Sequence, residues 1–552
     1  MKNLIAFLLV AGIIIGSTTR CARRGSPNGG PKDSLSPIMV TAEPEYKSIY
    51  FKEKRIKLSF DEYVKFKDLF KQLIISPPLK YAPVIKPLGS ASKEITIDLL
   101  DTLKENTTYS INFGNSIVDN NEGNKLGSFK YVFSTGSYVD SLEIHGDIKD
   151  AFEKEPAENI AVMLYEINET YTDSTVYKEK PIYVTNTLDS TFFNITNVKP
   201  GTYQLIALKD FNNNFIYNPK QDKIGFLDKP IQLPTDSTFH LDLFQETLDF
   251  KILKPLENKI GKIIFGYEGI PDSLDIKLLS ETPEDFRSFL NKDAKSDTLN
   301  FWFTPFDADS LQFQVKTKDL DTIYTVQLRT SKIDSLLLNT TVKGVLHPKD
   351  TFAITANIPF DSIKNNNITI IDKDTLAIPF QTFLDKSKTK LSIYFDRKRN
   401  ENIQIDILPN LFVDCQGETN DTLQYKLKTL DIEDYATLKV GIKNIKKFPI
   451  MVDLITTKGE LIERKYSNKE THFTFNDITP STYLIRITFD SNNNKKWDTG
   501  SFLHKTQPEK IIYFNKELKL RANWTVNEIF DINNPSPILP KEDENSQFPL
   551  RR

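Results

Sequence analysis

Apolar side chains alternate with polar ones along most of the chain. Ile56, Leu58 and Phe60, for example, share one side of an extended segment, which is the pattern of a strand with one buried face. The alternation returns in three further stretches (95–99, 109–113 and 129–133). Turn-forming clusters such as Pro77-Pro78 separate these stretches. The pattern predicts a β-sandwich over residues 37–136.

A second set of alternating stretches follows residue 137 and ends in a loop rich in asparagine, LKDFNNNFIYNPKQDKIGF (208–226). Near the C-terminus, residues 473–502 repeat this pattern, with Tyr483 and Asp490 in the positions of Tyr203 and Asp210. The repeat predicts two copies of one sandwich module. Their predicted bounds are 137–236 and 433–532.

The segment before the second copy resembles the end of the first domain. Asp414 and Gly417 stand in a turn like that of Asp119 and Gly123. We therefore expect a pair of sandwiches used twice, with residues 341–432 as the second copy of the first domain. Between the pairs, residues 237–340 predict a β-sandwich of no recognisable family. Residues 533–552 are rich in proline and charge and predict a disordered tail.

Composition supports an all-β fold of tandem β-sandwiches. The chain has 552 residues, too many for one core, and its 38 Phe and 21 Tyr favour strands. The 71 basic and 74 acidic residues give a net charge of −3, which argues against a nucleic-acid partner. With only Cys21 and Cys415, we expect no disulfide to stabilise a domain.

The N-terminal sequence predicts where the protein is located. Lys2 is followed by an apolar run over residues 4–16 and then by Cys21, the order of a secretory signal peptide that ends at a cysteine. The run is shorter than the roughly 20 residues of a membrane-spanning helix. We predict a signal peptide over 1–20, lipidation of Cys21 and a flexible tether over 21–36. Arg20 is a poor residue before a lipidated cysteine, so an unmodified Cys21 stays an alternative.

The repeated loops carry the only recurring polar constellation. Its members share the spacing D-x-N-x-N-x-x-x-[ND]: Asp210, Asn212, Asn214, Asn218, and again Asp490, Asn492, Asn494, Asp498. Oxygen ligands at positions one, three, five and nine suit calcium, a hard cation. However, the glycine at position six and the glutamate at position twelve of an EF-hand are missing, and asparagine also favours plain Asx-turns. Calcium binding and a structural turn are both left open.

Signatures of catalysis are scarce, so we expect a protein that is not an enzyme. The five histidines show no metal-binding spacing, and there is no G-x-S-x-G or phosphate-cradling glycine loop. Cys415 lies in a turn with no histidine near it in sequence. The sequence predicts that no cofactor is required, apart from the possible calcium.

Five stretches carry resemblances to known families. FDEYV (60–64), TTYSINFGNSIVDNNEGN (107–124) and YVFSTG (131–136) resemble the bacterial Ig-like domain named for an S-layer protein. The turn VKPGTY (198–203) is similar to that of a transthyretin-like or carboxypeptidase-regulatory-like sandwich. The stretch GSPNGGPKD (25–33) after Cys21 resembles the start of outer-membrane lipoproteins from Bacteroidota with bacterial Ig-like domains.

These resemblances imply a lipid-anchored outer-membrane protein that acts as a binding or assembly module in the cell envelope. An accessory role in an outer-membrane barrel complex, with a protein partner in that membrane, is the expected function. Whether the body faces the periplasm or the surface is left open. The alternative is a surface glycan-binding or adhesive protein, for which Tyr217 and Trp497 would be exposed aromatic platforms.

Overall fold

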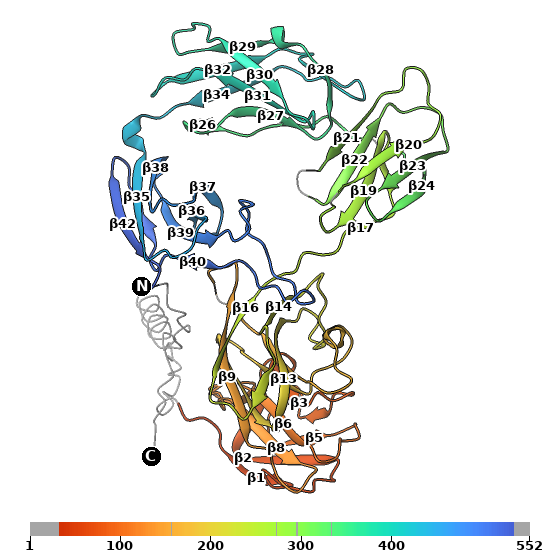
Figure 1. Ribbon diagram of the computed structural model, residues 1–552, viewed down its shortest axis with the longest axis vertical. Coiled ribbons are helices and arrows are strands. Elements are labelled where there is room, and N and C mark those ends of the chain that lie inside the picture. The colour runs from red at the N-terminus through yellow and green to blue at the C-terminus, as the bar shows by residue number, and fades with distance from the viewer. Residues whose placement is uncertain (1–32, 156, 272, 294–295, 333, 535–552) are drawn as a thin grey trace, which may run out of the picture. The chain divides into compact units, whose positions relative to one another are not determined.

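The computed structural model describes residues 33–534, apart from 156, 272, 294–295 and 333 (Figure 1). The predicted all-β fold of tandem sandwiches is confirmed, because the described strands pair into sheets that form five successive sandwiches, numbered here 1 to 5. The helical elements described are short: α2 (Leu69–Gln72), η1 (Asp173–Tyr177), η2 (Asn365–Asn367) and η3 (Ile432–Asp434). The chain divides after Asp140 into two compact units, and sandwich 1 lies in the first.

Sandwich 1 packs two sheets, ordered β1-β2-β5-β4 and β3-β6-β8, with β7 added beside β2. Its strands are β1 (Met39–Glu43), β2 (Arg55–Phe66), β3 (Ile74–Ser76), β4 (Val84–Lys86), β5 (Ser92–Asp98), β6 (Thr108–Gly114), β7 (Ile117–Asp119) and β8 (Phe129–Ser134). The alternating apolar positions form its core: Ile56, Leu58 and Phe60 are buried, as are Ile97 and Phe133.

Sandwich 3 has the strand order of sandwich 1, although the sequence alone associates it with no family. Its main sheet contains β17-β19-β22-β21, with β18 beside β19, and β20-β23-β24 form the second sheet. The strands are β17 (Lys251–Ile252), β18 (Leu256–Lys259), β19 (Lys262–Glu268), β20 (Asp275–Leu278), β21 (Ser288–Lys292), β22 (Thr298–Phe303), β23 (Ser310–Lys316) and β24 (Asp321–Gln327). Phe265, Phe301 and Phe313 pack edge-to-face in its core.

Sandwich 4 repeats the arrangement once more, with sheets β25-β27-β31-β30 and β26-β34-β32-β29 and a separate β28-β33 pair. Its strands are β25 (Leu338–Thr340), β26 (Gly344–Val345), β27 (Phe352–Ala356), β28 (Phe360–Ile363), β29 (Ile368–Ile371), β30 (Phe380–Leu384), β31 (Lys390–Phe395), β32 (Asn402–Ile407), β33 (Phe412–Asp414) and β34 (Leu423–Lys428). The strand β25 begins three residues before the predicted boundary at 341.

Sandwiches 2 and 5 share a different topology, as expected for two copies of one module. Sandwich 2 has sheets β11-β10-β13-β14 and β12-β9-β16, and sandwich 5 has β37-β36-β39-β40 and β38-β35-β42. In sandwich 2 the short strand β15 pairs with the start of β13, and in sandwich 5 the short strand β41 pairs with the start of β39.

The strands of these two copies have the following bounds. In sandwich 2 they are β9 (Leu142–Asp150), β10 (Ala161–Glu166), β11 (Tyr183–Asn186), β12 (Phe192–Val198), β13 (Gly201–Lys209), β14 (Lys223–Phe226), β15 (Ile231–Leu233) and β16 (Thr238–Leu243). In sandwich 5 they are β35 (Ala436–Lys443), β36 (Ile450–Thr456), β37 (Leu461–Ser467), β38 (His472–Ile478), β39 (Thr482–Phe489), β40 (Ile511–Tyr513), β41 (Leu518–Lys519) and β42 (Thr525–Asp531).

The end of sandwich 2 differs from the predicted boundary at residue 236. The strand β16 lies beyond it and pairs in parallel with β9. Leu241 and Leu243 on this strand are buried in the core of sandwich 2, so their apolar area ties the strand to that module rather than to the next.

The predicted signal peptide, Cys21 and the tail beyond residue 534 lie outside the described residues. Within the part of the chain that is described, no helix is long and apolar enough to cross a membrane.

Candidate functional sites in the repeated loops

The loop between β13 and β14 of sandwich 2 is built on the carboxylate of Asp210. One of its oxygens accepts the backbone N–H of Asn212 at 3.0 Å, and the other accepts that of Phe215 at 2.6 Å. Asn213 and Phe215 adopt left-handed backbone angles, with φ of 52° and 61°. Asparagine tolerates this conformation better than most residues, which explains one of the three consecutive asparagines.

The corresponding loop of sandwich 5 is built in a similar way around Asp490. Its two carboxylate oxygens accept the backbone N–H groups of Asn494 at 3.0 Å and Lys495 at 2.8 Å. Asn493 and Lys495 are left-handed, with φ of 64° and 63°. They occupy the positions of Asn213 and Phe215 in the first copy. The repeat seen in the sequence therefore extends to the backbone conformation.

The remaining predicted residues are also brought together in the second copy. The side-chain amides of Asn492 and Asn494 both donate to one oxygen of Asp498, at 2.5 Å and 2.7 Å. Asn214 of the first copy accepts the N–H of Ile216 at 2.8 Å, as Asn494 accepts that of Lys496 at 2.8 Å. Asn218 accepts the N–H of Lys220 at 3.2 Å.

A second acidic residue closes each loop, and the sequence analysis missed both of them. In sandwich 2, Asp222 accepts the N–H of Phe211 at 2.9 Å and that of Asn218 at 2.8 Å. In sandwich 5, Glu509 accepts the N–H of Ser491 at 2.5 Å and that of Asp498 at 3.2 Å.

Both closing carboxylates are buried, and each comes one or two residues before the strand that follows the loop. That shared position is the sequence signal that identifies them. The segment from Asp210 to Asp222 is shorter than the segment from Asp490 to Glu509. A search at constant spacing therefore does not match the two closing residues.

The hydrogen bonds of both loops are those of Asx-turns. Among the residues that the structure describes, no group of three or more His, Cys, Asp or Glu side chains is arranged to hold a metal ion. Burial raises the pKa of Asp210, and although the N–H of Phe215 lowers it, the neighbouring charge of Asp222 raises it again. A cation would relieve this repulsion, but calcium binding stays a prediction.

The two loop aromatics are not exposed platforms, and that part of the adhesive interpretation is corrected. Tyr217 is 2 % exposed, and its hydroxyl donates to Glu246 at 2.6 Å. The Trp497 indole N–H donates to the carbonyl oxygen of Glu509 at 2.9 Å, and its ring lies 4.9 Å from that of Phe152. Tyr217 is therefore buried, and Trp497 is half-buried against Phe152.

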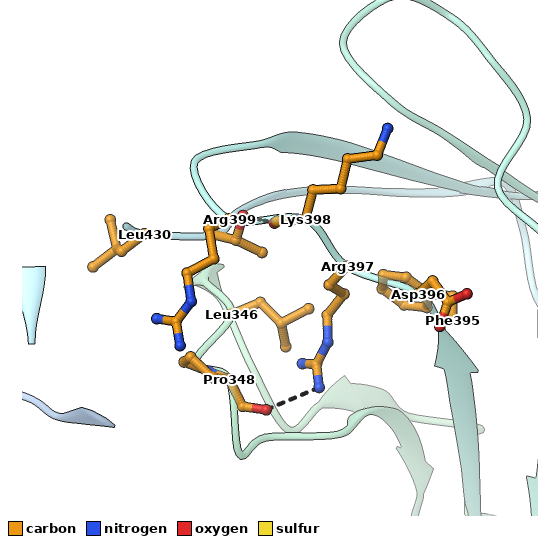
Figure 2. Close-up of a pocket in the computed structure, with 9 residues that line it drawn as sticks. Leu346, Pro348, Phe395, Asp396, Arg397, Lys398, Arg399 and Leu430 are labelled. Carbon is orange, nitrogen blue, oxygen red and sulfur yellow. Dashed lines mark hydrogen bonds between the residues drawn. The ribbon is translucent and has the colours of Figure 1, made fainter. Parts of the chain in front are cut away.

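A cavity of about 350 Å³ lies where sandwich 4 meets the chain leading into sandwich 5 (Figure 2). It is lined by three consecutive basic residues and by mainly apolar neighbours: Leu346, Pro348, Phe395, Asp396, Arg397, Lys398, Arg399, Thr429 and Leu430.

The arginines of this cavity already have partners. The Arg397 guanidinium donates to the carbonyl oxygens of His347, Pro348 and Asp350, and Arg399 donates to Asp477 of sandwich 5 at 3.0 Å. Figure 2 shows Lys398 pointing away from both arginines. The cavity is thus part of the joint between the two sandwiches, which His347 completes by bonding the Asp477 carbonyl oxygen at 2.6 Å.

The comparisons with known proteins bear on sandwich 1. Residues 33–135 match the family model of a bacterial Ig-like domain. This confirms the resemblance predicted for residues 37–136. Sandwiches 3 and 4 share the strand order of this Ig-like domain, which relates all three by topology. No curated protein matches the chain.

Several solved structures align with much of the chain at low identity. They include the S-layer protein rSbsC(31-844), with 12% identity over 88% of this chain and 68% of that one and a TM-score of 0.15. The Bacillus cereus major pilin subunit BcpA has 8% identity over 72% and 99%, with a TM-score of 0.14. The Bacillus anthracis TIE protein has 9% identity over 93% and 76%, with a TM-score of 0.15. At these scores the alignments carry no argument about function.

Proposed function

We propose that the protein is a non-enzymatic lipoprotein of the outer membrane that acts as a binding or assembly module, as an accessory subunit of an outer-membrane barrel complex. The support comes from the signal-peptide pattern before Cys21, from the GSPNGGPKD stretch and from the Ig-like match of residues 33–135. The described loop carboxylates bind backbone N–H groups, so they serve as parts of a scaffold.

The edge strand β1 carries this proposal furthest. It pairs with β2 on one side, so the backbone groups of its other side are available to a strand from a partner. Its Val40 and the preceding Ile38 are both more than 60 % exposed. Because β1 follows directly on the predicted tether, the exposed edge is also the part of sandwich 1 nearest in sequence to the anchor.

The experiment is purification from membranes in mild detergent. A barrel protein that co-purifies in fixed stoichiometry, and is lost in Val40→Asp, supports the assembly role. The matched control is Ile323→Asp, which changes an equally exposed apolar residue on β24 of sandwich 3 and should keep the partner. Recovery of the wild-type chain without any stoichiometric partner would contradict the proposal.

The adhesive function is a second candidate because sandwich 1 exposes other aromatic residues. Tyr50, Tyr63 and Phe70 are each more than half exposed, and exposed rings suit stacking on sugars. Retention of the purified chain on envelope polysaccharide, lost in Tyr50→Ala or Tyr63→Ala, would favour adhesion over assembly.

A further inference from the structure

The loop of sandwich 5 extends beyond its Asp490 turn and contacts sandwich 2. We call residues 497–507 the closing loop. Phe502, at its tip, has no exposed area, and its ring meets that of Phe226 on β14 edge-on, with centroids 5.2 Å apart. Tyr177 lies 6.3 Å away from the same ring. An apolar side chain of sandwich 5 is therefore buried in the surface of sandwich 2. Burial of apolar area is the main favourable contribution to the free energy of such contacts.

Hydrogen bonds surround this apolar contact. The backbone N–H of Phe502 donates to Glu246 at 2.7 Å, and the Thr499 hydroxyl donates to the carbonyl oxygen of Gln245 at 2.5 Å. Glu246 also accepts the hydroxyl of Tyr217, so one carboxylate connects the loops of both copies. These polar groups are thereby satisfied as the apolar centre becomes buried.

Two further side chains of the closing loop reach sandwich 2. Gln507 donates to the carbonyl oxygen of Phe226 at 3.0 Å, and the Lys505 ammonium lies 2.7 Å from the carboxylate of Asp173. Lys505 also covers the Phe502 ring, 4.0 Å from its centroid. The ion pair is partly exposed, so it sets the register of the contact more than its strength.

Gly500 allows the close approach. A Cβ at this position would lie 2.6 Å from the ring of Phe244 and 2.6 Å from the carbonyl oxygen of Thr506. Real Cβ atoms do not come this close, so any other residue would push the closing loop away from sandwich 2.

A second contact covers the outer face of the sheet in sandwich 5. Phe152 of sandwich 2 lies against Trp497 and 4.6 Å from the Arg486 guanidinium. The Tyr513 hydroxyl donates to the carbonyl oxygen of Phe152 at 2.6 Å. Arg486 in turn bonds the fully buried Asp453, so the face under Phe152 is charged.

The equivalent face of the first copy is apolar. Met163 and Ile206 pair in the register that Asp453 and Arg486 occupy in the second copy, and both are buried. The segment between β10 and β11 contains η1 and the buried Val176. In sandwich 5 a tight turn replaces this segment, which leaves the face to be covered by sandwich 2.

From these contacts we infer that sandwiches 2 and 5 bind each other within one chain. Sandwiches 3 and 4 lie between them in the sequence, so the closing loop brings together the two ends of that intervening segment. The surface around Tyr177, Phe226 and Phe244 is the docking site, and its occupant is the closing loop of the same molecule. Because the chain already connects the partners, binding is intramolecular and needs no high affinity. The inference is independent of the proposed membrane role.

The test is cross-linking of the full chain carrying Gln245→Cys and Thr499→Cys, with Cys21→Ser and Cys415→Ser to remove other thiols. A short bismaleimide should give one internal cross-link, seen as a shift in denaturing gels and as a joined peptide in mass spectrometry. Adding Phe502→Asp should abolish the cross-link. The matched control Phe211→Asp changes an exposed phenylalanine of the sandwich 2 loop and should leave it intact.

Hydrogen exchange of the same variants separates an open contact from an unfolded module. Phe502→Asp should lose protection at residues 244–246 and in the closing loop, while the core strands β10 and β36 stay protected. A cross-link that forms between two chains, or one that survives Phe502→Asp, would overturn the inference.

Discussion

The carboxylates of Asp119 in sandwich 1 and Asp414 in sandwich 4 hold the same turn. One oxygen of each accepts the backbone N–H groups of the residues two and four positions later, at 2.8 Å and 3.1 Å for Asp119 and at 2.8 Å and 2.9 Å for Asp414. The second oxygens differ, because that of Asp119 accepts the N–H of Asn124 at 2.6 Å whereas that of Asp414 is buried and has no hydrogen-bond partner in the described structure.

Because of this difference, the pKa of Asp119 is lowered and the pKa of Asp414 is raised. Burial alone would raise the pKa of Asp119, but four backbone N–H groups lower it below its usual value. Burial raises the pKa of Asp414, and its fewer N–H donors do not reverse the shift. The ionised form is therefore favoured in the first turn and disfavoured in the second.

The first prediction is a pH dependence of opposite sign for the two turns. A lowered folded pKa gives Asp119 a stabilising contribution that is present above the unfolded pKa of about 3.9 and is lost as the pH falls through the folded pKa. Asp119→Asn should thus destabilise sandwich 1 at neutral pH and cost less in acid. Asp414 favours the fold below its unfolded pKa and loses that contribution as the pH rises, so Asp414→Asn should be tolerated better at neutral pH than in acid.

Hydrogen exchange of residues 117–124 and 412–419 across this pH range measures both effects. Equal pH dependence of the two variants would contradict the assignment of the N–H donors as the cause.

The second prediction concerns calcium in the repeated loops. If Asp490, Asn492 and Asn494 bind calcium, the ion should raise the melting temperature of sandwich 5, because a ligand at 100 times its dissociation constant adds about 2.7 kcal/mol. Fluorescence of Trp497 should change on binding, and Asp490→Ala should lose both responses. Identical melting curves in calcium and in chelator would leave only the structural turn.

The third prediction concerns the buried charges of sandwich 5. Asp453 accepts from Arg464 at 2.6 Å and from Arg486 at 2.8 Å, so Asp453→Ala should leave two uncompensated cations and cost about 3–5 kcal/mol in the free energy of unfolding. In the first copy Val184 pairs with Met163 where Arg464 pairs with Asp453. Replacing all three charged residues by their apolar counterparts (D453M, R464V, R486I) should recover most of that loss. Thermal unfolding measures it, and a triple variant no more stable than Asp453→Ala would contradict the explanation.

The fourth prediction tests the anchor. Cys21→Ser should release the mature protein from the membrane fraction and abolish lipid labelling. A variant that stays membrane-bound and unprocessed would show that residues 4–16 act as an uncleaved segment.

Local patterns predicted the fold because each strand buries one face, so the alternation around Ile56 or Ile97 already marks the core. They also predicted the loops, since the Asx-turns of Asp210 and Asp490 depend on residues a few positions away. They missed Asp222 and Glu509, whose distance from the turn differs between the copies. They also placed Tyr217 at the surface, because the segment that buries it comes from elsewhere in the chain, and the contact of Phe502 with Phe226 joins positions too far apart for any local pattern.

The parallel pairing of first and last strands has a mechanical consequence. In sandwich 2 the chain enters at the start of β9 and leaves at the end of β16, and these ends lie at opposite limits of one strand pair because the strands are parallel. The pairing of β35 with β42 repeats this in sandwich 5. Tension along the chain would shear such hydrogen bonds side by side instead of opening them one after another, so a pull on the protein meets two modules whose outermost bonds must break together.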